Sequence, residues 1–191
     1  MYNFALSILK KLPPELAHSL TINLLKFSNF NKEIIDDPIL SQHLMGLDFP
    51  NPIGLAAGFD KNAEVTRQMF NFGFGFIEIG TVTPFMQKGN EKPRVFRLNN
   101  DKAIINHLGF NNGGILKVKK NLKKIRDTYF DNKIIGVNIG KNKETINSVD
   151  DYLFGLESLN NLSSYITINI SSPNTKGLRD LQLRGNIENF I

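Results

Sequence analysis

The stretch "NPIGLAAGFDKNAEVTRQMFNFGFGFIEIGT", residues 51–81, gives the clearest indication of the fold class. Its first part, residues 51–59, is a short apolar run bounded by proline and glycine, which is the pattern of a buried parallel strand. Residues 62–73 are predicted to form a helix that stops at a glycine, and residues 74–81 form a second apolar strand. Strand, helix and strand in direct succession indicate a parallel βαβ unit.

The same alternation continues along the chain. A helix is expected over residues 113–130, a strand over 133–140, a helix with an aspartate start signal over 150–162, a strand over 164–171 and a further helix from residue 178. Four strands with helical connections predict an α/β fold, either a doubly wound sheet or a (β/α) barrel. In both architectures the functional residues gather at the carboxyl ends of the strands.

The segment before residue 46 has a different pattern. Residues 2–29 predict two short helices, the second of which starts after Pro13 and Pro14, and residues 29–45 form a polar link. The second helix carries an apolar stripe made of Leu16, Leu20, Leu24 and Phe27. This stripe is compatible with a helical hairpin packed on the core and also with a pair of amphipathic helices that contacts a membrane surface.

Composition limits the classes of function. The 191 residues carry a net charge of +5 and no cysteine, which favours anionic partners and excludes disulfides, zinc thiolates and cysteine nucleophiles. The basic residues are spread along the chain, so a solvated surface is expected and no nucleic-acid partner. His18, His43 and His107 are scattered, and no metal site is predicted. No apolar run is long enough to span a membrane, and the N-terminus lacks a signal-peptide pattern.

The predicted strand ends carry small and hydrogen-bonding residues. A flat ring could lie against the backbone of Ala57 and Gly58, and Lys61 follows as a cation. A tight turn beside a surface lysine is the plain alternative for these residues alone. The other ends carry hydroxyls and amides at Thr81, Asn138, Asn169, Ser171, Ser172, Asn174 and Thr175. Together they suit a neutral ring ligand with many hydrogen bonds better than a metal ion.

The segment 85–114 is long and rich in turn-forming residues, which predicts a lid or a binding loop. Asn106 is a candidate ligand amide there, and Phe110 a candidate wall. The run "GVNIGKNK", residues 136–143, is one residue short of a phosphate-binding P-loop and lacks its Ser or Thr, so that motif is rejected.

Six motifs in order extend this interpretation: "NPIGLAAGFDKNAE", "GFGFIEIGTVTP", "GNEKPRVFRL", "INHLGFNN", "GVNIGKNK" and "INISSPNTKGLRDLQ". With them the chain resembles the quinone-dependent (class 2) dihydroorotate dehydrogenases, from its N-terminal helices to its last residue. The resemblance implies a (β/α)8 barrel with FMN at its carboxyl rim. It also implies oxidation of dihydroorotate to orotate in pyrimidine synthesis, with a membrane quinone as electron acceptor.

The resemblance also implies roles for individual residues. Ser172 is the expected catalytic base, and Thr175 and Phe110 are expected to support it. His18 is expected near the quinone entrance, although a packed histidine is an equal alternative. The flavin-contacting set is Ala57, Gly58, Lys61, Thr81, Asn138 and Asn169. The substrate-binding set is Lys61, Asn106, His107, Leu108, Gly109, Phe110, Asn169 and Asn174, with His107 where the related enzymes commonly have arginine.

The resemblance divides the chain at residue 45. Residues 1–45 would form a helical extension that attaches peripherally to the cytoplasmic face of the membrane, and residues 46–191 would form the first half of the barrel. The absence of cysteine disfavours the class 1 dihydroorotate dehydrogenases, which resemble this pattern but use a catalytic cysteine. It also disfavours the dihydrouridine synthases, another FMN-barrel family with a catalytic cysteine.

A complete barrel of this type needs about 250 residues. Four strands, a flavin-stabilising lysine, part of the substrate clamp and the phosphate loops are therefore expected outside these 191 residues. The chain is expected not to oxidise dihydroorotate by itself. The alternative is a catalytically inert half-barrel that acts at most as a binding or pairing module.

Overall fold

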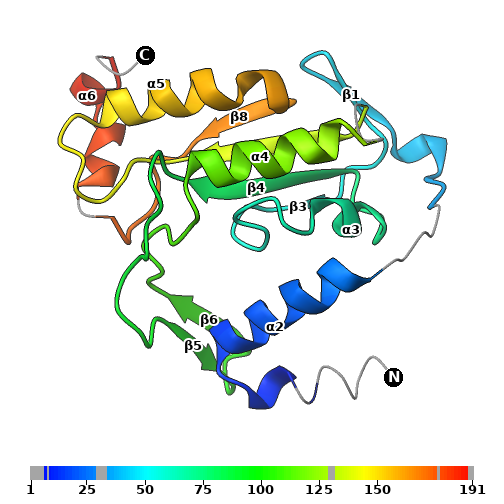
Figure 1. Cartoon of the computed structure of the whole chain (residues 1–191), viewed down its shortest axis with the longest axis horizontal. Coiled ribbons are helices and arrows are strands. Elements are labelled where there is room, and N and C mark those ends of the chain that lie inside the picture. Colours follow the sequence, from blue (N-terminus) through cyan, green and yellow to red (C-terminus); the bar gives the residue numbers. More distant parts are fainter. Residues whose placement is uncertain (1–6, 8, 29–33, 129–131, 176, 189–191) are drawn as a thin grey trace.

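The computed structural model describes residues 7, 9–28, 34–128, 132–175 and 177–188, and its centre is a four-stranded parallel sheet (Figure 1). The strands are β3 (Gly54–Leu55), β4 (Phe76–Val82), β7 (Ile134–Ile139) and β8 (Tyr165–Ile168). Their spatial order, β3-β4-β7-β8, follows their order in the sequence. Successive strands lie side by side in a (β/α) barrel, whereas the order reverses in a doubly wound sheet. The topology is therefore that of a barrel segment.

Helices cover one face of this sheet. These are α3 (Thr66–Phe70), α4 (Ile115–Arg126) and α5 (Ser148–Leu159), and Figure 1 shows α4 and α5 lying along the strands. Alternate strand residues point toward the helices and form the core: Ile77, Ile79, Ile135, Val137 and Ile139. From α4, the buried Ile115, Val118 and Leu122 recur at helical spacing, while its lysines lie on the outer side, as the sequence predicts.

The other face of the sheet corresponds to the barrel interior and is more polar. Phe76, Glu78, Tyr165 and Thr167 are half-buried there. Gly136 lies opposite Tyr165 in the register, and a Cβ at position 136 would come within 2.1 Å of the Tyr165 ring. This close approach requires glycine at that position, so the tyrosine ring fills the space of the missing side chain.

Helix α2 (Pro14–Phe27) lies beside an antiparallel hairpin of β5 (Val95–Leu98) and β6 (Ala103–Asn106) (Figure 1), and its buried Ile22 belongs to the hydrophobic core. Arg94 Nη2 donates to Glu15 Oε1 at 2.8 Å, and Arg94 is only 5% exposed. Arg97 Nη1 donates to the Leu12 carbonyl oxygen at 2.6 Å. These bonds join the helix to the hairpin.

The predicted apolar stripe of α2 does not pack on the described core. Ala17 and Ile22 are buried, but Leu24 is 62% and Phe27 87% exposed, and Leu16 and Leu20 are also exposed. The first predicted helix lies partly outside the described residues, because residues 1–6 and 8 are not described. Throughout the described ranges, no helix has the length and apolarity needed to cross a membrane.

The prediction of one long loop over residues 85–114 is wrong, because this segment contains β5 and β6. The predicted link over residues 29–45 also contains structure, a 3-10 turn (η1, Pro38–Leu40) and β1 (Gln42–Leu44), which pairs with β2 (Leu47–Phe49). These short antiparallel pairs form through tight local turns rather than through strong periodicity. The predicted boundary between residues 45 and 46 falls in the β1–β2 turn.

Three helix predictions also need correction. Asn147, not an aspartate, caps α5, because its side chain accepts a bond from Val149 N. The expected helix from residue 178 consists of a 3-10 segment (η3, Leu178–Gln182) followed by a short α6 (Arg184–Glu188). Helix α3 is shorter than residues 62–73, because Asp60 accepts bonds from Glu64 N and Val65 N and holds the preceding residues in a turn.

Candidate functional site

The sequence-predicted site residues lie near the carboxyl ends of the four parallel strands. Ala57, Gly58 and Lys61 follow β3, Thr81 lies near the end of β4, and Asn138 lies near the end of β7. Asn169, Ser172, Asn174 and Thr175 follow β8. Because the strands are parallel and adjacent, these ends form one edge, called here the carboxyl rim.

Three side chains from neighbouring strands form one hydrogen-bonded cluster at the rim. Thr81 Oγ1 donates to Asn138 Oδ1 at 2.6 Å. Asn169 Nδ2 donates to Thr81 Oγ1 at 3.0 Å and to Asn138 Oδ1 at 3.1 Å. Thr81 and Asn138 are buried, and Asn169 is half-buried. The structure thus brings together three of the six residues predicted to contact a flavin.

The backbone after β3 is open beside this cluster. Gly58 N donates to the Gly80 carbonyl oxygen at 2.8 Å, which fixes the segment against β4. Gly58 has φ +112°, and a Cβ built on it would meet no atom within 4 Å. Ala57 is half-buried and Gly58 exposed. The space beside this backbone is therefore open to a planar group.

Lys61 is held by the segment that follows β6. Its Nζ donates to Asn111 Oδ1 at 2.5 Å. Burial and the nearby Arg94 guanidinium lower the pKa of Lys61 to about 8, although Glu15 opposes this shift. The residue is therefore a cation below about pH 8 and a neutral amine above it.

Ser172 lies in the segment that follows β8. Ser172 is half-buried, and its Oγ accepts a bond from Asn174 N at 3.2 Å. Thr175 is buried, and its carbonyl oxygen accepts from Leu178 N at 3.2 Å. Asn174 Nδ2 donates to the Asn106 carbonyl oxygen at 3.5 Å, which joins this segment to the end of β6.

Asn106, Leu108, Gly109 and Phe110 lie in the segment that returns from the hairpin to the sheet. The buried Gly109 and the half-buried Phe110 both have positive φ angles, +68° and +51°. Phe110 lies against Gly140, because a Cβ on Gly140 would come within 3.0 Å of its ring. This places the phenylalanine ring at the end of β7, close to the rim cluster.

The two predicted histidines pack on other rings. His107 stacks on Phe96 with ring centroids 5.8 Å apart, so its ring lies on the hairpin rather than with the rim cluster. His18 Nε2 donates to the Phe59 carbonyl oxygen at 2.8 Å, and its ring meets Phe59 edge-on at 5.4 Å. His18 thereby joins α2 to the loop after β3.

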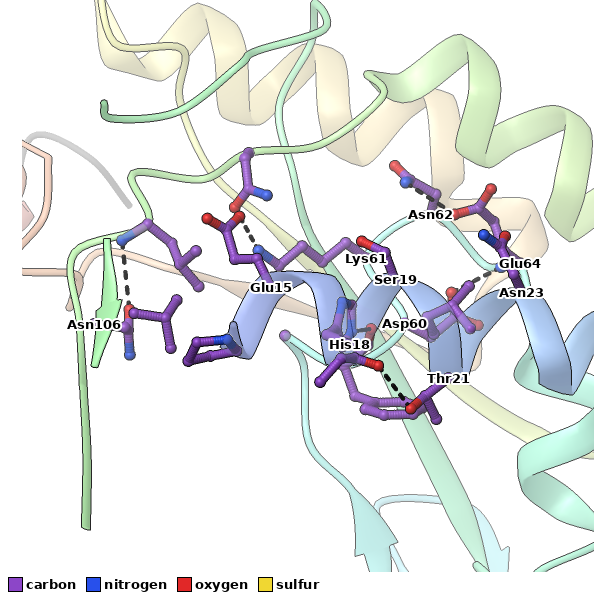
Figure 2. Close-up of a pocket in the computed structure, with 18 of the residues that line it drawn as sticks. Glu15, His18, Ser19, Thr21, Asn23, Asp60, Lys61, Asn62, Glu64 and Asn106 are labelled. Carbon is purple, nitrogen blue, oxygen red and sulfur yellow. Dashed lines mark hydrogen bonds between the residues drawn. The ribbon is translucent and has the colours of Figure 1, made fainter. Parts of the chain in front are cut away.

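A pocket of about 820 Å³ lies between α2, the loop after β3 and the hairpin (Figure 2). Figure 2 shows Glu15 and His18 on the helix, with Lys61 and Asp60 on the loop behind them. Gly58, Asn106, Leu108 and Asn111 also line it. The pocket therefore adjoins the carboxyl rim and connects two parts of the predicted site.

Sequence reasoning missed two carboxylates that organise this site. Asp60 is 1% exposed and accepts from the backbone of Glu64 and Val65 and from Thr66 Oγ1 at 2.8 Å. Glu78 accepts from Asn138 Nδ2 at 2.9 Å. A charged residue inside the apolar run "FGFIEIGT" is the signal that indicates Glu78. Within the described ranges, no group of three or more His, Cys, Asp or Glu residues could hold a metal ion.

The parallel sheet, with its strands in sequence order and its polar side chains along one carboxyl rim, defines a protein of the (β/α)-barrel class. The family model described as "Dihydroorotate dehydrogenase" matches residues 39–191. The chain belongs to the dihydroorotate dehydrogenase family. This confirms the family resemblance and the fold prediction of a (β/α)8 barrel, of which these residues form about four units.

Curated relatives and solved structures agree with this family. The dihydroorotate dehydrogenase (quinone) of Acinetobacter baylyi is 50% identical in an alignment of 190 positions that covers 95% of this chain and 54% of that protein. The protein of the same name from Bartonella tribocorum is 51% identical, over 95% of this chain and 49% of its own length. A crystal structure of DHODH from Eimeria tenella with ferulenol has a TM-score of 0.86 at 46% identity, covering 93% of this chain and 49% of that one. The chain spans about half the length of these relatives.

Proposed function

We propose that this chain carries the N-terminal part of a quinone-dependent dihydroorotate dehydrogenase, which oxidises dihydroorotate to orotate in pyrimidine synthesis. The observation that carries the proposal is the Thr81, Asn138 and Asn169 cluster at three adjacent strand ends, next to the open backbone of Gly58. These groups offer a flat, hydrogen-bonding surface to a ring ligand. Family membership supports the same activity.

The rim residues fit FMN as the cofactor. The Ala57 and Gly58 backbone would lie against the ring system, because no side chain occupies the space above Gly58. Thr81, Asn138, Asn169 and Lys61 would hold its polar edge. When bound, FMN supplies the hydride acceptor that oxidation of a saturated carbon requires.

Ser172 is the proposed base for the proton on C5 of dihydroorotate. The C5–H bond breaks, the proton goes to Ser172 Oγ, and the serine's own proton leaves to water. A serine hydroxyl is a weak base at its ordinary pKa, so it needs donors that stabilise charge on its oxygen. The Asn174 N–H, 3.2 Å from Ser172 Oγ, is such a donor. Thr175 and Phe110 would keep this segment in place.

The substrate clamp is proposed to come from two segments that meet. Asn174 Nδ2 contacts the Asn106 backbone, so amides from the end of β6 and from the segment after β8 lie together. Leu108, Gly109 and Phe110 would form the wall beside them. His107 would act only by shaping this segment, because its ring stacks on Phe96. Lys61 would attract the substrate carboxylate.

The pKa of Lys61 makes binding of the anionic product pH-dependent. Orotate affinity is expected to stay level below about pH 8, the pKa of Lys61, and to fall above it as the amine loses its proton. The Lys61→Arg variant should remove this fall, since a guanidinium stays charged. The measurement is orotate titration from pH 6 to roughly pH 10. The same fall in the Arg variant would contradict the role of Lys61.

The quinone site and the membrane contact are proposed at α2. The stripe of Leu16, Leu20, Leu24 and Phe27 is exposed, and Lys26 lies at the same end of the helix as Phe27. An exposed apolar face suits the surface of a membrane, here proposed as the cytoplasmic face, although the Lys26 ammonium pairs with Glu64 Oε1 at 3.0 Å. The pocket behind α2, lined by His18, would admit the quinone to the rim.

Two preparations test the proposed function. The first is the 191-residue chain; the second, called the completed chain, joins it to the second half of the Acinetobacter baylyi relative. With FMN and a quinone, the completed chain should oxidise dihydroorotate and the 191-residue chain should not. Turnover by the 191-residue chain would contradict the requirement for the second half. A completed chain that binds FMN without turnover would support the inert pairing module instead.

A further inference from the structure

Glu78 lies on the interior face of β4, before Thr81 of the rim cluster in the same strand. Its Oε1 accepts from Asn138 Nδ2 at 2.9 Å. Its Oε2 accepts from Thr167 Oγ1 at 3.0 Å and from Tyr165 Oη at 3.2 Å. The carboxylate thus receives three bonds from the two next strands of the sheet.

The direction of these bonds follows from the chemistry of the carboxylate. An ionised carboxylate can only accept hydrogen bonds, whereas an amide can turn either its oxygen or its nitrogen to a partner. Asn138 must therefore present its nitrogen to Glu78 and its oxygen to Thr81 and Asn169. Burial and the Glu78 carboxylate raise the pKa of Tyr165, so this hydroxyl stays protonated and donates.

The orientation of Asn138 decides what the rim offers to a ligand. Asn138 Oδ1 already accepts from Thr81 Oγ1 and Asn169 Nδ2. Its nitrogen has two N–H groups, of which one is bonded to Glu78. Within the described part of the chain, the second N–H has no protein partner. A fixed Asn138 therefore presents a donor, and a reversed one would present an acceptor.

We propose that Glu78 is a positioning residue that fixes the Asn138 amide so that its free N–H faces an acceptor atom of the bound cofactor. The inference rests on the proposed function for the identity of that cofactor. The hydrogen-bond direction itself rests only on the four protein side chains that meet at Glu78 and Asn138.

The Glu78→Gln variant tests the proposal, because it keeps the size of the side chain but can both donate and accept. The first measurement is the side-chain amide signal of Asn138 in the isotope-labelled 191-residue chain. Native protein should show one Asn138 amide proton that exchanges slowly with water. In Glu78→Gln this exchange should be at least ~10-fold faster, or the signal should split between two orientations.

The second measurement is FMN affinity of the completed chain. Glu78→Gln should weaken FMN binding ~10-fold and shift the flavin absorption band, because the donor to the ring is no longer fixed. The matched control is Thr167→Val, which removes another bond to the same carboxylate and should change affinity less than ~2-fold. Unchanged amide exchange and unchanged FMN affinity in Glu78→Gln would overturn the proposal.

The two measurements separate this proposal from the proposed function. If the native completed chain does not bind FMN, the cofactor assignment fails, while the Asn138 signal still reports on the amide. If Glu78→Gln lowers FMN affinity only because the local structure is destabilised, Thr167→Val should lower FMN affinity to the same extent. Equal losses in the two variants would therefore also contradict a positioning role for Glu78.

Discussion

Replacing Ser172 with alanine in the completed chain should lower dihydroorotate turnover ~10²- to 10⁴-fold, the usual contribution of a positioned general base. The alanine cannot take the C5 proton, and the Asn174 N–H then has no oxygen to stabilise. FMN affinity should stay within ~2-fold of native, since Ser172 Oγ contacts no member of the Thr81, Asn138 and Asn169 cluster in the described structure. Steady-state turnover and flavin titration give the two values.

Ser171→Ala is the matched control for this prediction. Ser171 is the neighbouring serine, and its Oγ donates to Asn169 Oδ1 at 3.2 Å rather than contacting the Asn174 N–H. Its removal should change turnover far less than the removal of Ser172. Equal losses in both variants would mean that the segment after β8 needs its hydroxyls for structure, and that Ser172 is not the base.

Replacing Arg94 with methionine should lower the free energy of unfolding by about 1–3 kcal/mol, because the loss of a buried charged donor leaves its acceptors without a partner. Arg94 is 5% exposed and bonds Glu15 together with the Lys88 and Asn90 carbonyl oxygens, each at 2.7 Å. Its removal leaves the Glu15 carboxylate unpaired and the two carbonyl oxygens without this donor. Urea unfolding of the 191-residue chain measures the change.

A double variant separates the contribution of the ion pair to the free energy of unfolding from that of side-chain packing. Glu15→Met with Arg94→Met should be less destabilised than the sum of the single variants, since neither charge is left alone. The Arg94 hydrogen bond also lowers the pKa of Glu15 against the effect of burial, so the stability from this pair is present above pH 4.5 and is lost as pH falls below it. A change below about 1 kcal/mol in Arg94→Met would show that the pair contributes little.

The parallel sheet could be predicted because each strand is a compact apolar run that ends at polar or small residues. β7 is buried along its whole length and β4 is buried on the face toward the helices and at its carboxyl end, so both have strong local patterns. The β1–β2 and β5–β6 hairpins could not be predicted, since their strands are short and β1 and β6 are wholly exposed. Their structure depends on turns and on contacts such as Arg97 with Leu12, which lie far apart in sequence.

The rim residues could be predicted because the carboxyl ends of parallel strands must share one edge. From that rule alone, Thr81, Asn138 and Asn169 are predicted to lie at the same edge of the sheet. It could not identify Glu78 or Asp60, whose importance depends on which backbone and side-chain groups face them in space. The stacking of His107 on Phe96 was hidden for the same reason, since the hairpin itself was not predicted.

Gly136 and Tyr165 have a consequence for sequence variation among relatives. The Tyr165 ring occupies the volume that a side chain at position 136 would need. The summed volume of the two side chains is therefore limited. A larger residue at position 136 can be accommodated only when position 165 becomes smaller. Substitutions at the two positions should therefore occur in pairs, and an alignment of relatives should show their sizes changing in opposite directions.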